Sequence, residues 1–249
     1  MMKIGYVIIC TTILTLIFSA VITNAEFYKD AENKQHVSIK IKKGWNLVPA
    51  YLADSIWGGS WWTLPQLSGE SVKVVYLLNP IDKKYILDTS YLGSEVYKEE
   101  ISTDKKSLLD KAGKDKELLS NLFFSAFWIY SKEDVNIDKI VGEGEIKGTV
   151  LEALNGDTMY KGWNFFSITP DLLGYKKLNS IKNDCKITKI VEWNVFTQSW
   201  DIGNVPDILE QEILADTAAV GQVVVIKVAE NCKLKSEESI TAPPPSLPT

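Results

Sequence analysis

The chain has 249 residues, of which 45% are hydrophobic and 10% aromatic, so a fully disordered protein is excluded and a substantial core can form. The formal net charge is −5, and all 27 basic residues are lysines, because the sequence contains no arginine. Nucleic-acid binding needs clustered positive charge, which this acidic chain does not favour. Bidentate recognition of phosphate or carboxylate needs the guanidinium group, so sites of that kind are excluded.

The first 25 residues have the order of a secretory signal peptide. Lys3 supplies a positive charge, an apolar run occupies 4–20, and small residues up to Ala25 suit a cleavage site. The run also has about the length of a membrane span, roughly 20 residues, so a retained anchor is the alternative. The sequence therefore predicts an extracytoplasmic protein with no membrane span after the leader. The polar segment 26–35 is expected to be flexible.

A Gly-Trp-Asn tripeptide occurs twice and marks an internal repeat. The two copies are Gly44, Trp45, Asn46 and Gly162, Trp163, Asn164. Before the first copy, apolar residues at 37–41 alternate with polar ones, which is the period of a half-buried strand. Before the second copy, Asn155-Gly156 is a hairpin turn signal. Glycine permits a turn, tryptophan is an apolar anchor and asparagine bonds local backbone, so we expect structural roles for all six residues.

Three further features follow each tripeptide in the same order: a hairpin ending in an aromatic residue, a helical stretch and a buried strand. The matched segments are 73–85 with 189–200, 108–122 with 206–214, and 127–134 with 224–231. Within the first segment pair, Lys73 aligns with Lys189. The order predicts a mainly β protein with short helices, built as two related β-sandwich or partly open β-barrel modules in tandem. Their expected bounds are 36–142 and 143–236.

These residues resemble the Gly-Trp-Asn-Leu repeat modules of exported bacterial and archaeal surface proteins. Residues 44–47 match the tetrapeptide itself. Tyr76 to Pro80 with Tyr85 match the family's hairpin that ends in an aromatic residue, and residues 127–129 match its aromatic strand. The second copy departs from it, with Phe165 in place of the leucine and valines in place of the aromatic strand. The resemblance covers most of the chain after the leader and implies a surface or secreted setting. It implies no reaction and therefore no catalytic residues.

Two cysteines remain after the leader, Cys185 and Cys232, and an even pair in an oxidising compartment predicts a disulfide. Cys185 stands just before the expected strand 187–191, and Cys232 follows the expected strand 223–228. If those strands are antiparallel neighbours, the two cysteines meet and the bridge can close. Two separate free thiols are the alternative.

Catalytic and metal-binding patterns are scarce in this sequence. His36 is the only histidine, so a Ser-His-Asp arrangement would have to use it, and zinc ligands are not clustered. The run 134–138 resembles calcium ligands but lacks the glycine and the closing glutamate. We therefore expect a protein that is not an enzyme and holds no metal or cofactor. The alternative is a glycoside hydrolase built on carboxylates such as Glu192 and Asp201. Apolar neighbours could raise the pKa of Glu192, although an outward strand position exposed to solvent is the ordinary expectation for it.

A tryptophan-rich loop is the candidate binding surface. Trp57, Trp61 and Trp62 lie among glycine, serine and proline, which is the composition of a surface loop. Clustered aromatic rings stack on sugars or anchor a partner protein, so these residues, with Trp200, are expected to bind an envelope glycan or a surface protein. A loop that plugs the end of a sandwich, or a purely structural subunit, is the alternative. The proline-rich end, 237–249, is expected to be a disordered tail.

Overall fold

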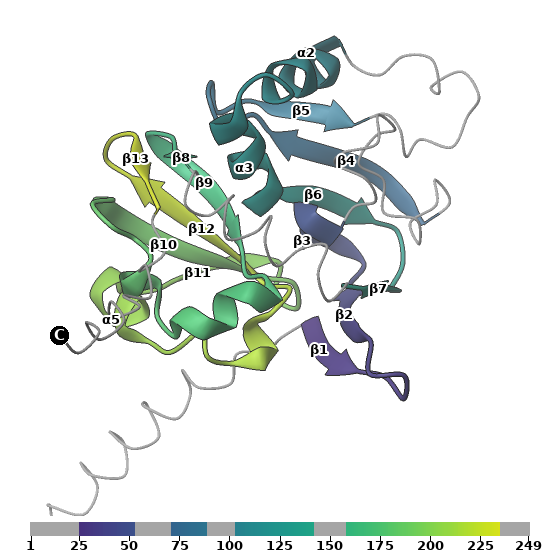
Figure 1. Cartoon of the computed structure of the whole chain (residues 1–249). Coiled ribbons are helices and arrows are strands. Elements are labelled where there is room, and N and C mark those ends of the chain that lie inside the picture. Colours follow the sequence, from purple (N-terminus) through teal and green to yellow (C-terminus); the bar gives the residue numbers. More distant parts are fainter. Residues whose placement is uncertain (1–24, 53–70, 89–102, 142–157, 235–249) are drawn as a thin grey trace, which may run out of the picture.

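The computed structural model describes residues 25–52, 71–88, 103–141 and 158–234, and Figure 1 shows how their elements are arranged. The fold is mainly β, as the sequence predicts, and its sheets are antiparallel, with no closed barrel in the described part. One four-stranded sheet has the order β3 (Gly44–Pro49), β6 (Ala126–Ser131), β4 (Val72–Leu78), β5 (Tyr85–Asp88). The other has the order β9 (Gly162–Ser167), β12 (Val223–Val228), β10 (Ile187–Asn194), β11 (Ser199–Ile202).

Two smaller sheets complete the strands. They are β1 (Ala25–Lys29), β2 (Gln35–Ile41) and β7 (Val135–Ile140), and the pair β8 (Thr158–Met159) and β13 (Cys232–Lys233). The short 3-10 turns are η1 (Ala50–Leu52), η4 (Pro170–Tyr175), η5 (Leu178–Ser180) and η6 (Thr217–Ala219). The predicted tryptophan loop, the Asn155-Gly156 turn, the leader up to position 24 and the proline-rich tail lie outside the described residues.

The helices are shorter than the sequence predicts. The expected stretch 108–122 is two helices, α2 (Thr103–Ala112) and α3 (Lys116–Phe124), because the chain leaves the helix at Gly113. Asp115 begins α3 by accepting hydrogen bonds from the backbone N–H groups of Glu117 and Leu118. The expected helix 206–214 is α5 (Val205–Glu210). Within the described ranges, no helix is long and apolar enough to cross a bilayer.

The two large sheets face each other across a shared apolar cluster. In β6, Phe127 points into the core of the first half, whereas Trp128 points towards the second sheet. In β12, Val224 points into the core of the second half, and Val225 points back towards Trp128. We call the shared cluster the seam; it comprises Leu47, Leu78, Ala126, Trp128, Phe165, Val191, Val223 and Val225, bordered by Trp45, Tyr76, Trp163 and Trp193. The sandwich therefore forms between the two halves of the chain.

The two four-stranded sheets also share their pairing register. Each has a register shift in the pairing of its two central strands, between Val72 and Val74 in β4 and between Ile187 and Lys189 in β10. Beyond the shift, Val75 lies opposite Ile129 and Ile190 lies opposite Ile226. The match of Lys73 with Lys189 read from the sequence is therefore wrong by one residue. Such a slip exchanges the faces of every side chain in the strand.

Each Gly-Trp-Asn tripeptide forms a corner closed by its asparagine. Asn46 accepts a bond from the backbone N–H of Lys42 at 2.8 Å and donates to the carbonyls of Lys42 and Gly44 at 2.7 and 2.9 Å. Asn164 makes the same three bonds with Tyr160 and Gly162, at 3.0, 2.8 and 3.1 Å. The glycines have φ values of +105° and +94°, which non-glycine residues rarely adopt. We call residues 44–46 and 162–164 the Gly-Trp-Asn corners.

The segment expected to be flexible, 26–35, is an ordered hairpin. Strand β1 pairs with β2 along its whole length, and Asp30 holds the turn by accepting the N–H groups of Glu32 and Lys34. Ala25, placed at the end of the leader by the sequence, is 5% exposed and packs against Gly221, where an added Cβ would lie 2.9 Å away. A cut after Ala25 would remove the first residue of β1.

The disulfide and its strand geometry are confirmed. Strands β10 and β12 are antiparallel neighbours, with Ile187 opposite Val228, so the ends that carry the cysteines meet. The Cα atoms of Cys185 and Cys232 are 5.2 Å apart, within the usual range for a bridge. The bridge ties the start of β10 to β13 behind the second sheet.

Candidate functional site

Of the four tryptophans expected to bind a ligand, Trp200 lies in the described residues and Trp57, Trp61 and Trp62 lie outside them. Trp200 is 42% exposed on the edge strand β11. All four residues of that strand are exposed, so an approaching molecule meets the whole strand.

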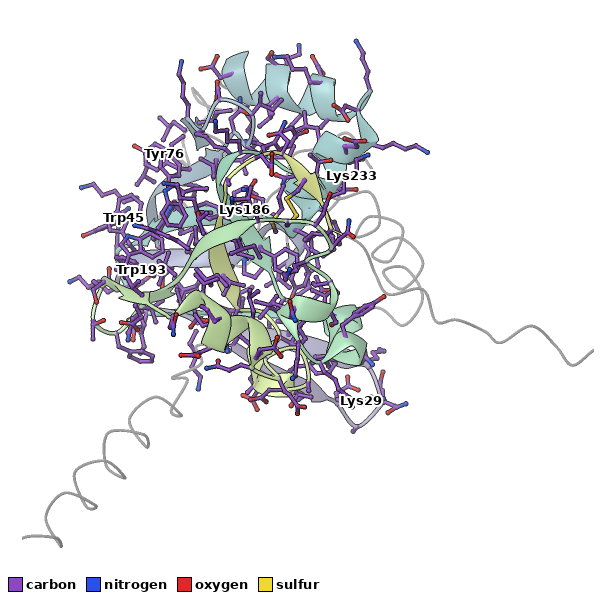
Figure 2. The ribbon with its side chains drawn as sticks, turned by 90° about the vertical axis from the view of Figure 1, so that its left-hand side faces the viewer. Lys29, Trp45, Tyr76, Lys186, Trp193 and Lys233 are labelled. Atoms are coloured by element: carbon purple, nitrogen blue, oxygen red, sulfur yellow. A yellow bond between two sulfur atoms is a disulfide. The ribbon has the colours of Figure 1, made fainter. Side chains whose placement is uncertain are left out.

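Trp200 is supported by two further tryptophans from both sheets. Its ring centroid lies 5.2 Å from that of Trp193, its cross-strand neighbour in β10, and 5.6 Å from that of Trp128 in β6. Trp128 and Trp193 are themselves 5.0 Å apart, and all three pairs meet edge to face. Figure 2 shows Trp193 on the same side of the molecule as Trp45 and Tyr76, which border the seam.

A tyrosine from the first sheet reaches the same tryptophan. Tyr85 in β5 is 53% exposed, and its hydroxyl accepts a hydrogen bond from Trp128 Nε1 at 3.2 Å. Trp128 is only 9% exposed, so it lies beneath two rings that stay open to solvent. We call Tyr85 and Trp200 the aromatic rim. The rings are fixed because Trp128 is packed in the seam.

The rim belongs to a wider pattern of exposed apolar side chains. Six of the seven large apolar side chains that are exposed in the described residues lie on the hairpins β4–β5 and β10–β11. They form three pairs at equivalent register positions: Ile81 with Phe196, Tyr85 with Trp200, and Leu87 with Ile202. Their gathering on these two hairpins makes the hairpins the candidate contact surface among the described residues.

The carboxylates Glu192 and Asp201 lie on the opposite face of the same hairpin. They are cross-strand partners, one position along from Trp193 and Trp200. Asp201 is exposed, but Glu192 is only partly so, which corrects the expectation of an outward, solvated glutamate. Burial raises the pKa of Glu192, and the negative charge of Asp201 raises this pKa further.

The only histidine lies far from the rim, in the sheet β1-β2-β7. His36 Nε2 is 3.1 Å from Asp30 Oδ2, and Nδ1 is 3.1 Å from Asp138 Oδ1. Tyr28 stacks on the imidazole with ring centroids 4.9 Å apart and donates its hydroxyl to Asp138 Oδ2 at 2.8 Å. The hydrogen bond to Asp30 raises the pKa of His36, burial opposes it, and the bond to Asp138 raises it further. We call these four residues the histidine clasp.

In the described ranges, no three His, Cys, Asp or Glu side chains gather as metal ligands would. A hollow of about 260 Å³ opens between β1, β2 and η6, where Glu26, Ser38 and Lys40 line it. It does not include the rim.

Sequence reasoning found Trp200 but missed Tyr85 and Trp128 as its neighbours. The sequence comparison pairs Tyr85 with Trp200 as the aromatic residues that end the two hairpins. It places Trp128 in a buried strand and does not bring it near either of them. The missed signal is the recurrence of apolar residues at three equivalent positions of the two hairpins. No protein-family model, curated protein or solved structure matches this chain.

Proposed function

We propose that this chain is a non-catalytic extracytoplasmic binding protein that holds a glycan of the cell envelope on its aromatic rim. The observation that supports this proposal is that Tyr85 and Trp200 are 53% and 42% exposed while both contact the buried Trp128. Flat rings held rigidly in this way offer apolar faces on which the C–H faces of sugar rings stack. The proposal involves no cofactor and no nucleic-acid partner.

The extracytoplasmic setting is supported by the leader-like segment 1–25 and by the Cys185–Cys232 bridge, because structural disulfides persist in oxidising compartments. The resemblance to the Gly-Trp-Asn-Leu modules agrees with a surface protein. The proposal includes two related modules at 36–142 and 143–236. Their support is the shared strand order, register shift and asparagine bonds of the two sheets.

The test is a titration of intrinsic tryptophan fluorescence with soluble hexasaccharides of β-linked glucose, β-linked N-acetylglucosamine and α-linked mannose. Trp200→Ala and Tyr85→Ala are each expected to weaken binding about tenfold or more, because each removes a central stacking ring. Ile140→Ala is the matched control, since Ile140 is 52% exposed but lies on β7, away from the rim. Failure of all three sugars to bind, or equal binding by the rim variants and wild type, would reject the proposal.

The second candidate function is a carboxylate-based glycoside hydrolase, favoured by the raised pKa of Glu192 beside Asp201. A raised pKa suits a general acid, and such enzymes place two carboxyl groups roughly 5–10 Å apart across the bond to be cut. If this function holds, the same hexasaccharides are hydrolysed by the wild type and not by Glu192→Gln. Binding without hydrolysis leaves the first proposal in place.

A further inference from the structure

Each half of the chain inserts one side chain into the Gly-Trp-Asn corner of the other half. In the first direction, Lys83 of the β4–β5 turn reaches the corner at 162–164. Its Nζ donates to the carbonyl oxygens of Trp163 at 2.8 Å and Tyr160 at 3.2 Å, and to Asn164 Oδ1 at 3.4 Å. The ammonium group therefore has three oxygen acceptors, all from the second half of the chain.

In the other direction, Gln198 of the β10–β11 turn reaches the corner at 44–46. Its Oε1 accepts the backbone N–H of Trp45 at 2.7 Å, and its Nε2 donates to the carbonyl of Trp45 at 3.1 Å. Trp193 Nε1 donates to the same carbonyl at 2.9 Å. Both inserted side chains thus donate an N–H group to the tryptophan carbonyl of the opposite corner.

The two inserted residues occupy equivalent places in their hairpins. Both lie two residues before the rim residue of their own strand, and both have a positive φ, +61° for Lys83 and +53° for Gln198. Non-glycine residues seldom adopt this conformation, so a matching pair in matching turns points to one shared requirement. The requirement is a turn that directs this side chain out of its own sheet and onto the other.

Gly44 leaves room for the inserted side chain, in addition to allowing the backbone conformation of its corner. A Cβ atom on Gly44 would lie 2.6 Å from Gln198 Oε1, which is too close. A Cβ atom on Gly162 would lie 3.4 Å from Lys83 Cε, at ordinary contact distance. The absence of a side chain at Gly44 therefore leaves room for Gln198, whereas the requirement for glycine at 162 comes from its positive φ.

We propose that the Gly-Trp-Asn corner is a docking socket for the hairpin turn of a second module of the same kind, and that this chain is a covalently joined pair of such modules. The contact is reciprocal, with the same socket and the same turn position used by each side, as in a two-fold symmetric dimer interface. The partner is defined by its chemistry. It carries, at this turn position, a long side chain that ends in an N–H donor.

The proposal predicts that the two halves stay together when the chain between them is cut. A protease site is inserted within 142–157 of the full chain, the purified protein is cleaved, and the fragments are separated by gel filtration at decreasing concentration. The wild-type fragments are expected to elute together. The double variant Lys83→Met, Gln198→Leu keeps the aliphatic stems but loses both donors, and its fragments are expected to associate about a hundredfold more weakly.

Two matched variants distinguish docking from general damage to the fold. Lys84→Met alters the exposed neighbour of Lys83 and is expected to leave the association unchanged. Lys83→Gln places at this position the residue type found at the equivalent position 198 of the other hairpin. This variant is expected to keep most of the association. Far-ultraviolet circular dichroism of the uncut double variant checks that both sheets remain folded. Separation of the wild-type fragments, or undiminished association of a folded double variant, would overturn the proposal.

Discussion

The histidine clasp shows how one side chain makes stability depend on pH. Both ring nitrogens of His36 face carboxylate oxygens, which favours the doubly protonated ring. The ring is also well shielded, since the His36 side chain is 13% exposed. The pKa of Asp30 is lowered, first by the backbone N–H of Lys34 and, against the opposing effect of burial, by the hydrogen bond to His36.

The free energy of unfolding should therefore fall as the pH rises above neutrality. Because the folded pKa of His36 is raised, its contribution is fully present below the ordinary value of 6.5 and is lost as the pH rises through the folded pKa. The contribution of Asp30 is present above the ordinary value of 3.8 and is lost as the pH falls through its lowered pKa. The clasp thus contributes most between these two ordinary values.

Urea unfolding at several pH values from 5 to 9 tests this, with nuclear magnetic resonance following the single imidazole. We expect the wild type to lose stability above pH 6.5 and the variant His36→Gln to lack that part of the loss. Tyr28→Phe keeps the histidine and the stacked ring, so its pH dependence should resemble that of the wild type. A folded pKa at or below 6.5 would contradict the prediction.

Single residues could be predicted from the sequence where their partners are close in the chain. The asparagines of the corners bond backbone groups two and four residues away, which is a local property of the residue type. By contrast, His36 bonds Asp138 at a separation of 102 positions, and Lys83 bonds Trp163 at a separation of 80. No local pattern encodes such pairs, so the clasp and the sockets became visible only in the folded chain.

Elements were predicted where hydrophobic period and turn chemistry agree. Strand β2 and the hairpins of β4–β5 and β10–β11 have clear signals, and they form as expected. Strand β1 was missed because Glu26 and Lys29 make it read as polar. Its backbone pairing with β2 and the burial of Ala25 stabilise the strand despite these charged residues. The sequence also could not show which side chains of β6 point towards which sheet, because the strand is buried on both faces and its residues do not alternate between apolar and polar.

The disulfide should add to the stability of the second sheet by restricting the unfolded chain. Its loop spans 47 positions and encloses β10, β11, α5 and β12, so its loss frees a long segment in the unfolded state. The chain-entropy account gives about 4 kcal/mol for a loop of this length. We expect the double variant Cys185→Ser, Cys232→Ser to lower the free energy of unfolding by about that amount, measured by urea titration.

Reduction of the wild type provides the matched control for these substitutions. Unfolding in a reductant should reproduce the lowered midpoint of the serine variant, and the reductant should leave the variant itself unchanged. Mass spectrometry of the non-reduced protein should give a mass lower, by two hydrogen atoms, than that of the protein with both thiols free. An unchanged midpoint on reduction would mean that the bridge adds nothing to the native state.

Contacts between the two halves also stabilise the assembled chain. Apart from the sockets, α3 crosses to the second half, where Asn121 donates to the buried carbonyl of Thr158 at 2.9 Å. Glu117 on the same helix accepts the hydroxyl of Thr158 at 2.8 Å and pairs with Lys233. Together with the seam, these contacts bury side chains of each half against the other half. The sequence pattern predicts two related modules, but it does not predict that the two large sheets share one apolar layer.

The seam should make the two halves unfold as one unit. Trp128 is its centre, because this one ring touches rings from four strands outside β6, namely those of Trp45, Phe165, Trp193 and Trp200. Replacing such a buried ring with alanine removes about 3–5 kcal/mol through lost transfer energy and a cavity. Here the cavity lies between the sheets, so we expect Trp128→Ala to uncouple them as well as destabilise them.

Differential scanning calorimetry separates these two effects. The wild type is expected to melt in one transition whose calorimetric and van't Hoff enthalpies agree, whereas Trp128→Ala is expected to melt in two. Phe127→Leu is the matched control, because Phe127 is the adjacent residue of β6 but points into the core of the first half. It should lower the melting temperature and keep one transition. If the wild type already melts in two steps, the seam does not couple the halves, and the close approach of the two sheets would be docking without cooperativity.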